Sequence, residues 1–177
     1  LDLEDGIPDS LKAEARQLVK DAIGTVGCGA AEVFVRVNKP FLEADIEASV
    51  WPGLRGIVLP QVESPAEVAH AAELLDSMER RRGIEVGSLD LVLLLESARG
   101  VWDVREIVTA SPRVTQAGLD ESDLAAAMGI SVLADYDPFV YARGRLAIEA
   151  TAAGVQPVGV AHPMGALPRL LAAEELL

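Results

Sequence analysis

Residues 89–100, LDLVLLLESARG, carry the pattern that decides the fold. Six leucine and valine residues surround a single Asp90 and run directly into Glu96. The pattern is typical of a buried parallel strand that ends in a carboxylate, followed by a loop. In a barrel of parallel strands, the ligand site is built from the C-terminal strand ends and the loops after them. Glu96 therefore lies where chemistry is expected, although a Glu at a strand end also often caps a helix.

Apolar segments on both sides of this stretch continue an alternation of strands and helices. The expected strands are 1–5, 31–38, 56–62, 89–96, 113–119 and 155–161. Between them the sequence predicts helices, among them one that begins with a capping box at Ser64, one over 102–110, and a helical tail over 167–177. This alternation predicts an α/β fold with a parallel sheet.

Two α/β architectures have this spacing, an open doubly wound sheet and a TIM (β/α)8-type barrel. No Gly-rich phosphate-binding pattern follows any strand, which disfavours a nucleotide-binding open sheet. A complete barrel needs eight strands and typically about 250 residues. Residues 1–177 are therefore predicted to form a single, apparently incomplete TIM-barrel domain without the first and last strands, with 1–5 as the second strand of the full pattern. Exposed strand edges would then favour aggregation or closure by a partner. A homo-oligomer, a trimer or hexamer, is expected.

Composition excludes several classes of function. The chain has 28 acidic and 15 basic residues, a net charge of −13, which argues against a nucleic-acid-binding surface. A single cysteine rules out an intrachain disulfide framework and favours a reducing compartment. No run approaches the roughly 18 apolar residues of a membrane span, and no signal-peptide layout is present. A soluble, cytoplasmic protein is expected.

Polar side chains concentrate at the C-terminal ends of the predicted strands. They are Glu4 and Asp5, Arg36 and Asn38, Gln61 and Glu63, Glu96, and Asp123. Two carboxylates from adjacent strands with one buried Arg suit Mg2+, which takes its remaining ligands from water and substrate. The cation would polarise a substrate carbonyl, and the Arg would hold a carboxylate or a developing enolate oxygen. The alternative for the last acidic segment is structural, because Asp120, Glu121 and Asp123 could each be a helix N-cap.

Several motifs resemble one known family in order and approximate spacing. They are LDLED followed by a proline and KAEAR, then VRVN, LPQVES, LLESARG and DLAAAMG. Together they are similar to the citrate lyase beta subunit family within the HpcH/HpaI aldolase group. The resemblance implies a TIM barrel in which Glu96 and Asp123 bind Mg2+ and Arg36 binds the carboxylate or carbonyl of an oxo acid. It also implies that Glu4 and Asp5 line the same pocket and, with Arg36, serve catalysis.

The sequence departs from the family pattern at three places. Gln61 stands where most members have Lys, which removes a cation from the pocket, and Asp120 stands where a Gly is usual. The second change affects the backbone amides that would hold a substrate carboxylate, so Arg36, Gln61 and Asp120 are the candidate substrate-binding residues. The family's C-terminal region, which supplies an acid in the CoA-lyase branch, has no counterpart in these residues. The reactive acid is therefore not assigned.

The resemblance implies a Mg2+-dependent carbon-carbon lyase that acts on a CoA thioester of a hydroxy acid, of the citryl-CoA or malyl-CoA type. The expected partners are a small oxo acid and a CoA thioester, with no nucleic acid and no membrane. A class II pyruvate-type aldolase of the HpcH/HpaI group is the alternative enzyme, since it shares the Glu and Asp metal pair. The third hypothesis is a non-catalytic family member that acts as a structural subunit. Gln61 and the expected lack of the first and last barrel strands favour it.

Overall fold

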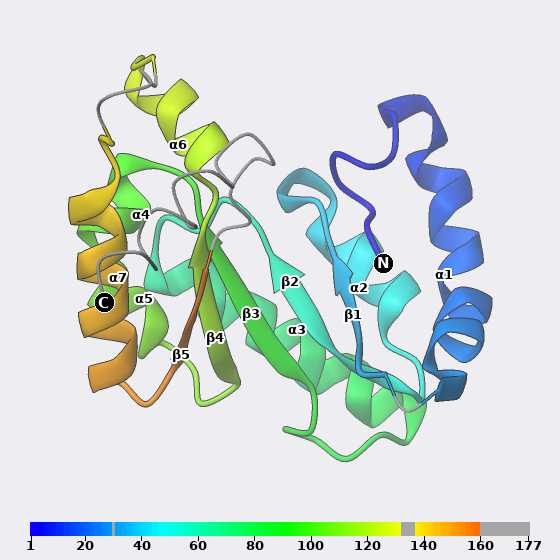
Figure 1. Ribbon diagram of the computed structural model, residues 1–177. Helices are drawn as coiled ribbons and strands as arrows, with labels where there is room; N and C mark the ends of the chain where they lie inside the picture. The colour runs from blue at the N-terminus through cyan, green and yellow to red at the C-terminus, as the bar shows by residue number, and fades with distance from the viewer. Residues whose placement is uncertain (30, 132–136, 160–177) are drawn as a thin grey trace.

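A five-stranded parallel sheet forms the centre of the molecule (Figure 1). The computed structural model describes residues 1–29, 31–131 and 137–159. The strands lie in the order β1-β2-β3-β4-β5, and each pairs in parallel with the next. Their bounds are β1 (Val33–Arg36), β2 (Leu54–Leu59), β3 (Asp90–Leu95), β4 (Val114–Leu119) and β5 (Gln156–Val158).

Helices connect every pair of neighbouring strands. They are α1 (Lys12–Val26), α2 (Leu42–Ser49), α3 (Pro65–Arg82), α4 (Ala98–Trp102), α5 (Val104–Val108), α6 (Glu121–Met128) and α7 (Val140–Ala152), with 3-10 turns η1 (Asp9–Leu11), η2 (Gly27–Gly29) and η3 (Lys39–Phe41). None of the helices in the described part of the chain is long and apolar enough to span a bilayer.

The order of the strands never reverses, which distinguishes this sheet from a doubly wound one. A doubly wound sheet changes direction at a switch point, and its helices cover both faces. With right-handed crossovers, strands added in one direction place their helices on one face of the sheet. Figure 1 shows α3 behind the sheet, with α1 beyond β1 and α7 beyond β5. The α/β prediction with a parallel sheet is confirmed, and β1 and β5 are the outer strands of the described sheet, with Asp2 bridging to Arg36 at the β1 edge.

The core lies between the strands and the helices that cover them. In β3, Leu91, Leu93 and Leu95 are fully buried, as the apolar run predicts. On α3, Val68 and Leu75 belong to the same core cluster. Successive strand residues point to opposite faces of the sheet, so Leu91, Leu93 and Leu95 share the face that packs against the helices. Glu96 follows immediately at the end of the strand.

Several predicted boundaries need correction. Residues 1–5 do not form a strand: Asp2 makes one isolated parallel bridge with Arg36, because the chain turns at Glu4, whose carbonyl accepts from the Ile7 amide. The expected helix over 102–110 is two short helices that meet at Asp103. The last expected strand is β5 up to Val158. Its end at 160–161 and the expected helix over 167–177 lie outside the described residues.

A buried ion pair connects the N-terminal ends of β3 and β4, away from Glu96. Arg113 donates to both carboxylate oxygens of Glu79 and to the carbonyl of Leu89. Glu79 is fully buried and also accepts from the amides of Gly87 and Leu89. The pair therefore fixes the connection from α3 to β3 against the start of β4.

Candidate metal and substrate site

A pocket of about 270 Å³ opens at the C-terminal ends of β2 and β3. Its lining comes from the segments that follow three consecutive strands and from η3: Lys39, Gln61, Glu63, Glu96, Ser97, Asp123 and Ala127. Strand ends of a parallel sheet share one edge, so residues distant in sequence meet there. The structure thus brings Glu96, Asp123 and Gln61 together.

Glu96 is the most buried acid of the pocket. Its residue is only 4% exposed, and neither carboxylate oxygen has a hydrogen-bond partner among the described residues. Burial raises the pKa of Glu96 to about 8, and the charges of Glu4 and Asp123 raise it further. The nearby backbone amide of Gln61 acts to lower this pKa, although it makes no hydrogen bond to the carboxylate. A buried carboxylate without a partner is unfavourable, and a bound cation would remove that cost.

The donor set fits Mg2+ in number and chemistry. Glu96 and Asp123 offer two carboxylates to one pocket, and Mg2+ binds protein through one or two carboxylates while keeping several waters or substrate oxygens. Within the described residues no group of three or more acidic, His or Cys side chains could hold a metal by itself. Two protein ligands would therefore leave coordination positions for a substrate.

Backbone contacts fix the end of β3 between its neighbours. The Val62 amide donates to the carbonyl of Leu94, and the Asp120 amide donates to the carbonyl of Leu95. Ser97 then caps α4 by accepting from the amide of Gly100. Glu96 is thus held on both sides, and its position is set by main-chain hydrogen bonds and not by a loop alone.

Gly100 lets α4 pack directly on the segment after β2. A Cβ at this position would lie 2.5 Å from the carbonyl oxygen of Val62. We expect Gly100→Ala to cost about 1–3 kcal/mol of unfolding free energy through overpacking, measured by urea denaturation. Gly144→Ala is the matched control, because no atom lies within 4 Å of its Cβ position. Equal stability of the Gly100 variant and the parent would contradict the close packing.

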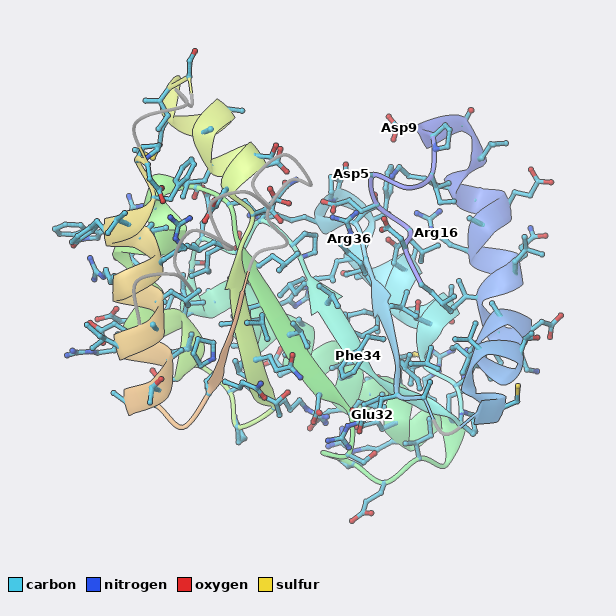
Figure 2. All side chains as sticks on the ribbon, in the orientation of Figure 1. Asp5, Asp9, Arg16, Glu32, Phe34 and Arg36 are labelled. Atoms are coloured by element: carbon cyan, nitrogen blue, oxygen red, sulfur yellow. The ribbon has the colours of Figure 1, made fainter. Side chains whose placement is uncertain are left out.

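Arg36, which is labelled in Figure 2, forms the second part of the cluster together with Glu4. The Nε and Nη2 of Arg36 donate to Asp2 at 2.9 and 2.6 Å, and Nη1 lies 2.9 Å from Glu4 Oε2. Asp5 is more remote, 3.7 Å from Nη1 with a side chain 70% exposed. Burial raises the pKa of Glu4 to about 6 although Arg36 acts against it. Because Gln61 Nε2 donates to Glu4 Oε1 at 3.3 Å, Gln61 connects this ion-pair group to the pocket.

Gln61 itself has an uncommon backbone. Its φ of 54° lies in the left-handed region and is the one such value among the described non-glycine residues. Side chains rarely adopt this conformation, and it recurs at functional sites where the surroundings enforce it. No pattern in the sequence indicates this conformation.

Asp120 is the N-cap of α6, a role that the sequence also allowed for Glu121 and Asp123. Its Oδ1 accepts from the amides of Ser122 and Asp123 and so caps α6. Asp120 does not line the pocket, whereas Asp123 does. Of the three acids that could have capped this helix, Asp120 is the cap, and the Asp123 carboxylate is left for the pocket.

A buried polar network holds the LDLED segment in place, and sequence reasoning missed it. Lys12 Nζ donates to the carbonyls of Leu3 and Glu4 and to Asn38 Oδ1. Asn38 in turn donates to Leu3 and to buried Asp45. Lys12 lies on the inner face of α1, where the spacing of the apolar residues could have indicated burial. The network fixes the backbone from which Glu4 extends.

Comparison with known proteins gives the chain a family. The sequence matches the HpcH/HpaI aldolase/citrate lyase family over residues 1–169. The citrate lyase subunit beta of Leuconostoc mesenteroides subsp. cremoris is 36% identical over 157 residues, which cover 87% of this chain and 52% of that protein. The L-malyl-CoA/beta-methylmalyl-CoA lyase of Cereibacter sphaeroides is 34% identical over 136 residues, covering 73% of this chain and 42% of that protein.

A solved structure agrees with the sequence match. The citrate lyase beta subunit from M. tuberculosis, complexed with oxaloacetate and magnesium, superposes with a TM-score of 0.70 at 27% identity, over 98% of this chain and 73% of that one. The chain spans about half the length of the curated relatives it matches. The resemblance carried by LDLED, VRVN and LLESARG is thereby confirmed, and the chain belongs to the HpcH/HpaI aldolase/citrate lyase family.

Proposed function

We propose that this chain is an arc of a TIM barrel and part of a Mg2+-dependent carbon-carbon lyase that acts on a CoA thioester of a hydroxy acid, of the citryl-CoA or malyl-CoA type. One observation carries the proposal: the buried Glu96 carboxylate, without a hydrogen-bond partner in the described residues, shares a pocket with Asp123. The names of the relatives support the reaction class, and the magnesium complex of one relative supports the metal.

Glu96 and Asp123 would hold the ion, which when bound supplies polarisation of the oxo-acid oxygen. The reaction breaks the bond between the hydroxyl-bearing carbon and the carbon next to the thioester. The hydroxyl loses its proton to a base and becomes the carbonyl of the oxo acid. The electron pair of the broken bond passes to the thioester enolate, which takes up a proton from an acid that these residues do not identify.

Arg36 and Glu4 would act on the substrate hydroxyl oxygen that becomes the carbonyl oxygen of the oxo acid. Asp2 occupies Nε and Nη2 of Arg36, so stabilisation of the oxo-acid oxygen would fall to Nη1, which lies 2.9 Å from Glu4 Oε2. Glu4 would accept the hydroxyl proton, since a base with a pKa of about 6 is close to neutral pH. Asp5 and Gln61 would support substrate binding from the edge of this group, and Asp120 would act only through the start of α6, which its side chain caps.

Turnover measurements test the proposal. The protein is assayed with citryl-CoA, malyl-CoA and a 4-hydroxy-2-oxo acid, each with and without Mg2+. We expect Mg2+-dependent release of acetyl-CoA from one of the two thioesters. Cleavage of the hydroxy-oxo acid alone would favour the pyruvate-type aldolase, which shares the two carboxylates. Absence of turnover with all three at saturating Mg2+ would favour a structural subunit.

A cytoplasmic homo-oligomer is part of the proposal, and light scattering that shows a stable monomer would contradict the oligomer.

A further inference from the structure

Lys39 lines the pocket and is held by two contacts. Its Nζ donates to the carbonyl of Gln61 at 2.8 Å and lies 2.7 Å from Glu67 Oε1. The other oxygen of Glu67 accepts from the amides of Glu63 and Ser64 in the capping box of α3. Because the carboxylate is fixed by the helix start, the ammonium that contacts it is fixed as well.

This ammonium retains the means to bind a ligand. It has three N–H donors, and the two contacts above account for two of them. The side chain is 33% exposed and lines the cavity that contains Glu96 and Asp123. In the described residues it is the one cationic side chain in that lining, against the three acids Glu63, Glu96 and Asp123.

The charge balance of the pocket gives this position a role. Glu96 and Asp123 would hold the ion, which would supply positive charge for the reacting end of an oxo acid, where the oxo group and one carboxylate are adjacent. A second carboxylate on the same molecule would need another cation, since it would otherwise face Glu63 in an acidic pocket. Arg36 is committed to Asp2 through two nitrogens, whereas Lys39 already lines the cavity.

We propose that Lys39 binds the carboxylate distal from the reacting carbonyl and so selects dicarboxylic over monocarboxylic oxo acids. This inference rests on the proposed function. It assigns to Lys39, which directly follows the VRVN motif, a specificity role that neither the resemblance nor the strand pattern indicates.

Isothermal titration of freshly prepared oxaloacetate and of pyruvate, each into the protein with saturating Mg2+, tests the role. We expect Lys39→Gln to weaken oxaloacetate binding by about 10- to 100-fold, the usual range for a lost hydrogen bond to a charged group, and to change pyruvate binding little. Lys39→Arg keeps the cation and should retain most of the preference. Arg81→Gln is the matched control, because it removes the same charge from an exposed ion pair with Glu47.

A further variant separates direct binding from loop structure. Glu67→Gln removes the ion pair but keeps the ammonium, and it should retain most of the preference for oxaloacetate. Equal losses for both acids in Lys39→Gln, or the full loss reproduced by Glu67→Gln, would overturn the inference. Titration of Mg2+ alone distinguishes a failure of the Lys39 role from a failure of the proposed function. A parent that binds Mg2+ and both acids with equal affinity contradicts only Lys39, whereas a parent that binds no Mg2+ overturns the proposed function too.

Discussion

Replacement of Glu96 or Asp123 by Ala is expected to lower kcat/KM of the lyase reaction by several orders of magnitude and leave the protein folded. Each variant removes one of the two pocket carboxylates that are proposed to hold the ion. Loss of about 1.4 kcal/mol of transition-state stabilisation costs tenfold in rate, and polarisation by a metal supplies several times that amount. Turnover of citryl-CoA and malyl-CoA at saturating Mg2+ measures the loss.

Two comparisons make this test specific. Glu47→Ala removes an exposed carboxylate on α2 and should behave as the parent does. Asp120→Ala removes the N-cap of α6 and should cost about 1 kcal/mol of stability, a loss that Asp123→Ala should not show. Full activity in both the Glu96 and the Asp123 variant would contradict the assigned roles.

Glu79→Ala should be the most destabilising substitution in the described core. It leaves Arg113 buried without its main partner and removes the acceptor for the amides of Gly87 and Leu89. Breaking a buried ion pair by removing one partner typically costs about 3–5 kcal/mol. Urea denaturation at neutral pH measures the difference. A loss no larger than that of an exposed acid such as Glu47 would contradict the role of the pair.

The same pair gives a pH dependence with a defined sign. Burial alone would raise the pKa of Glu79, but hydrogen bonds from Arg113 and from two backbone amides outweigh burial and hold the pKa below its ordinary value. The stabilisation is therefore present above the unfolded pKa of about 4.3 and is lost as the pH falls through the lower, folded value. Glu79→Gln is the control, since it does not ionise. The stability difference between parent and Glu79→Gln should shrink below about pH 4, and a constant difference would contradict the ionised pair.

Strand β3 and the capping box of α3 were predictable because their signals are local. An apolar run bounded by Glu96 admits few other structures, and Ser64 with Glu67 satisfies backbone donors within one turn of helix. The segment 1–5 was not predictable in the same way. Its alternation suits a strand, but the pairing with Arg36 and the turn after Glu4 depend on contacts with distant residues.

The candidate site shows the same division. Strand-end position and motif resemblance selected Glu96, Asp123, Arg36 and Glu4, and the structure brings these acids and the Arg into one electrostatic group. Lys12, Asp2 and Lys39 were missed because their importance arises from burial and from partners far along the chain. The choice of Asp120 over Asp123 as helix cap likewise depends on backbone geometry that three neighbouring acids cannot reveal.

Calorimetric titration of Mg2+ into the parent, Glu96→Ala and Asp123→Ala tests the shared metal site most directly. The burial of Glu96 without a hydrogen-bond partner, next to Asp123, predicts that the parent binds one Mg2+ and that each variant loses most of this affinity. Retained Mg2+ affinity in both variants, with Glu47→Ala unchanged beside them, would show that the ion is held elsewhere and would contradict the account.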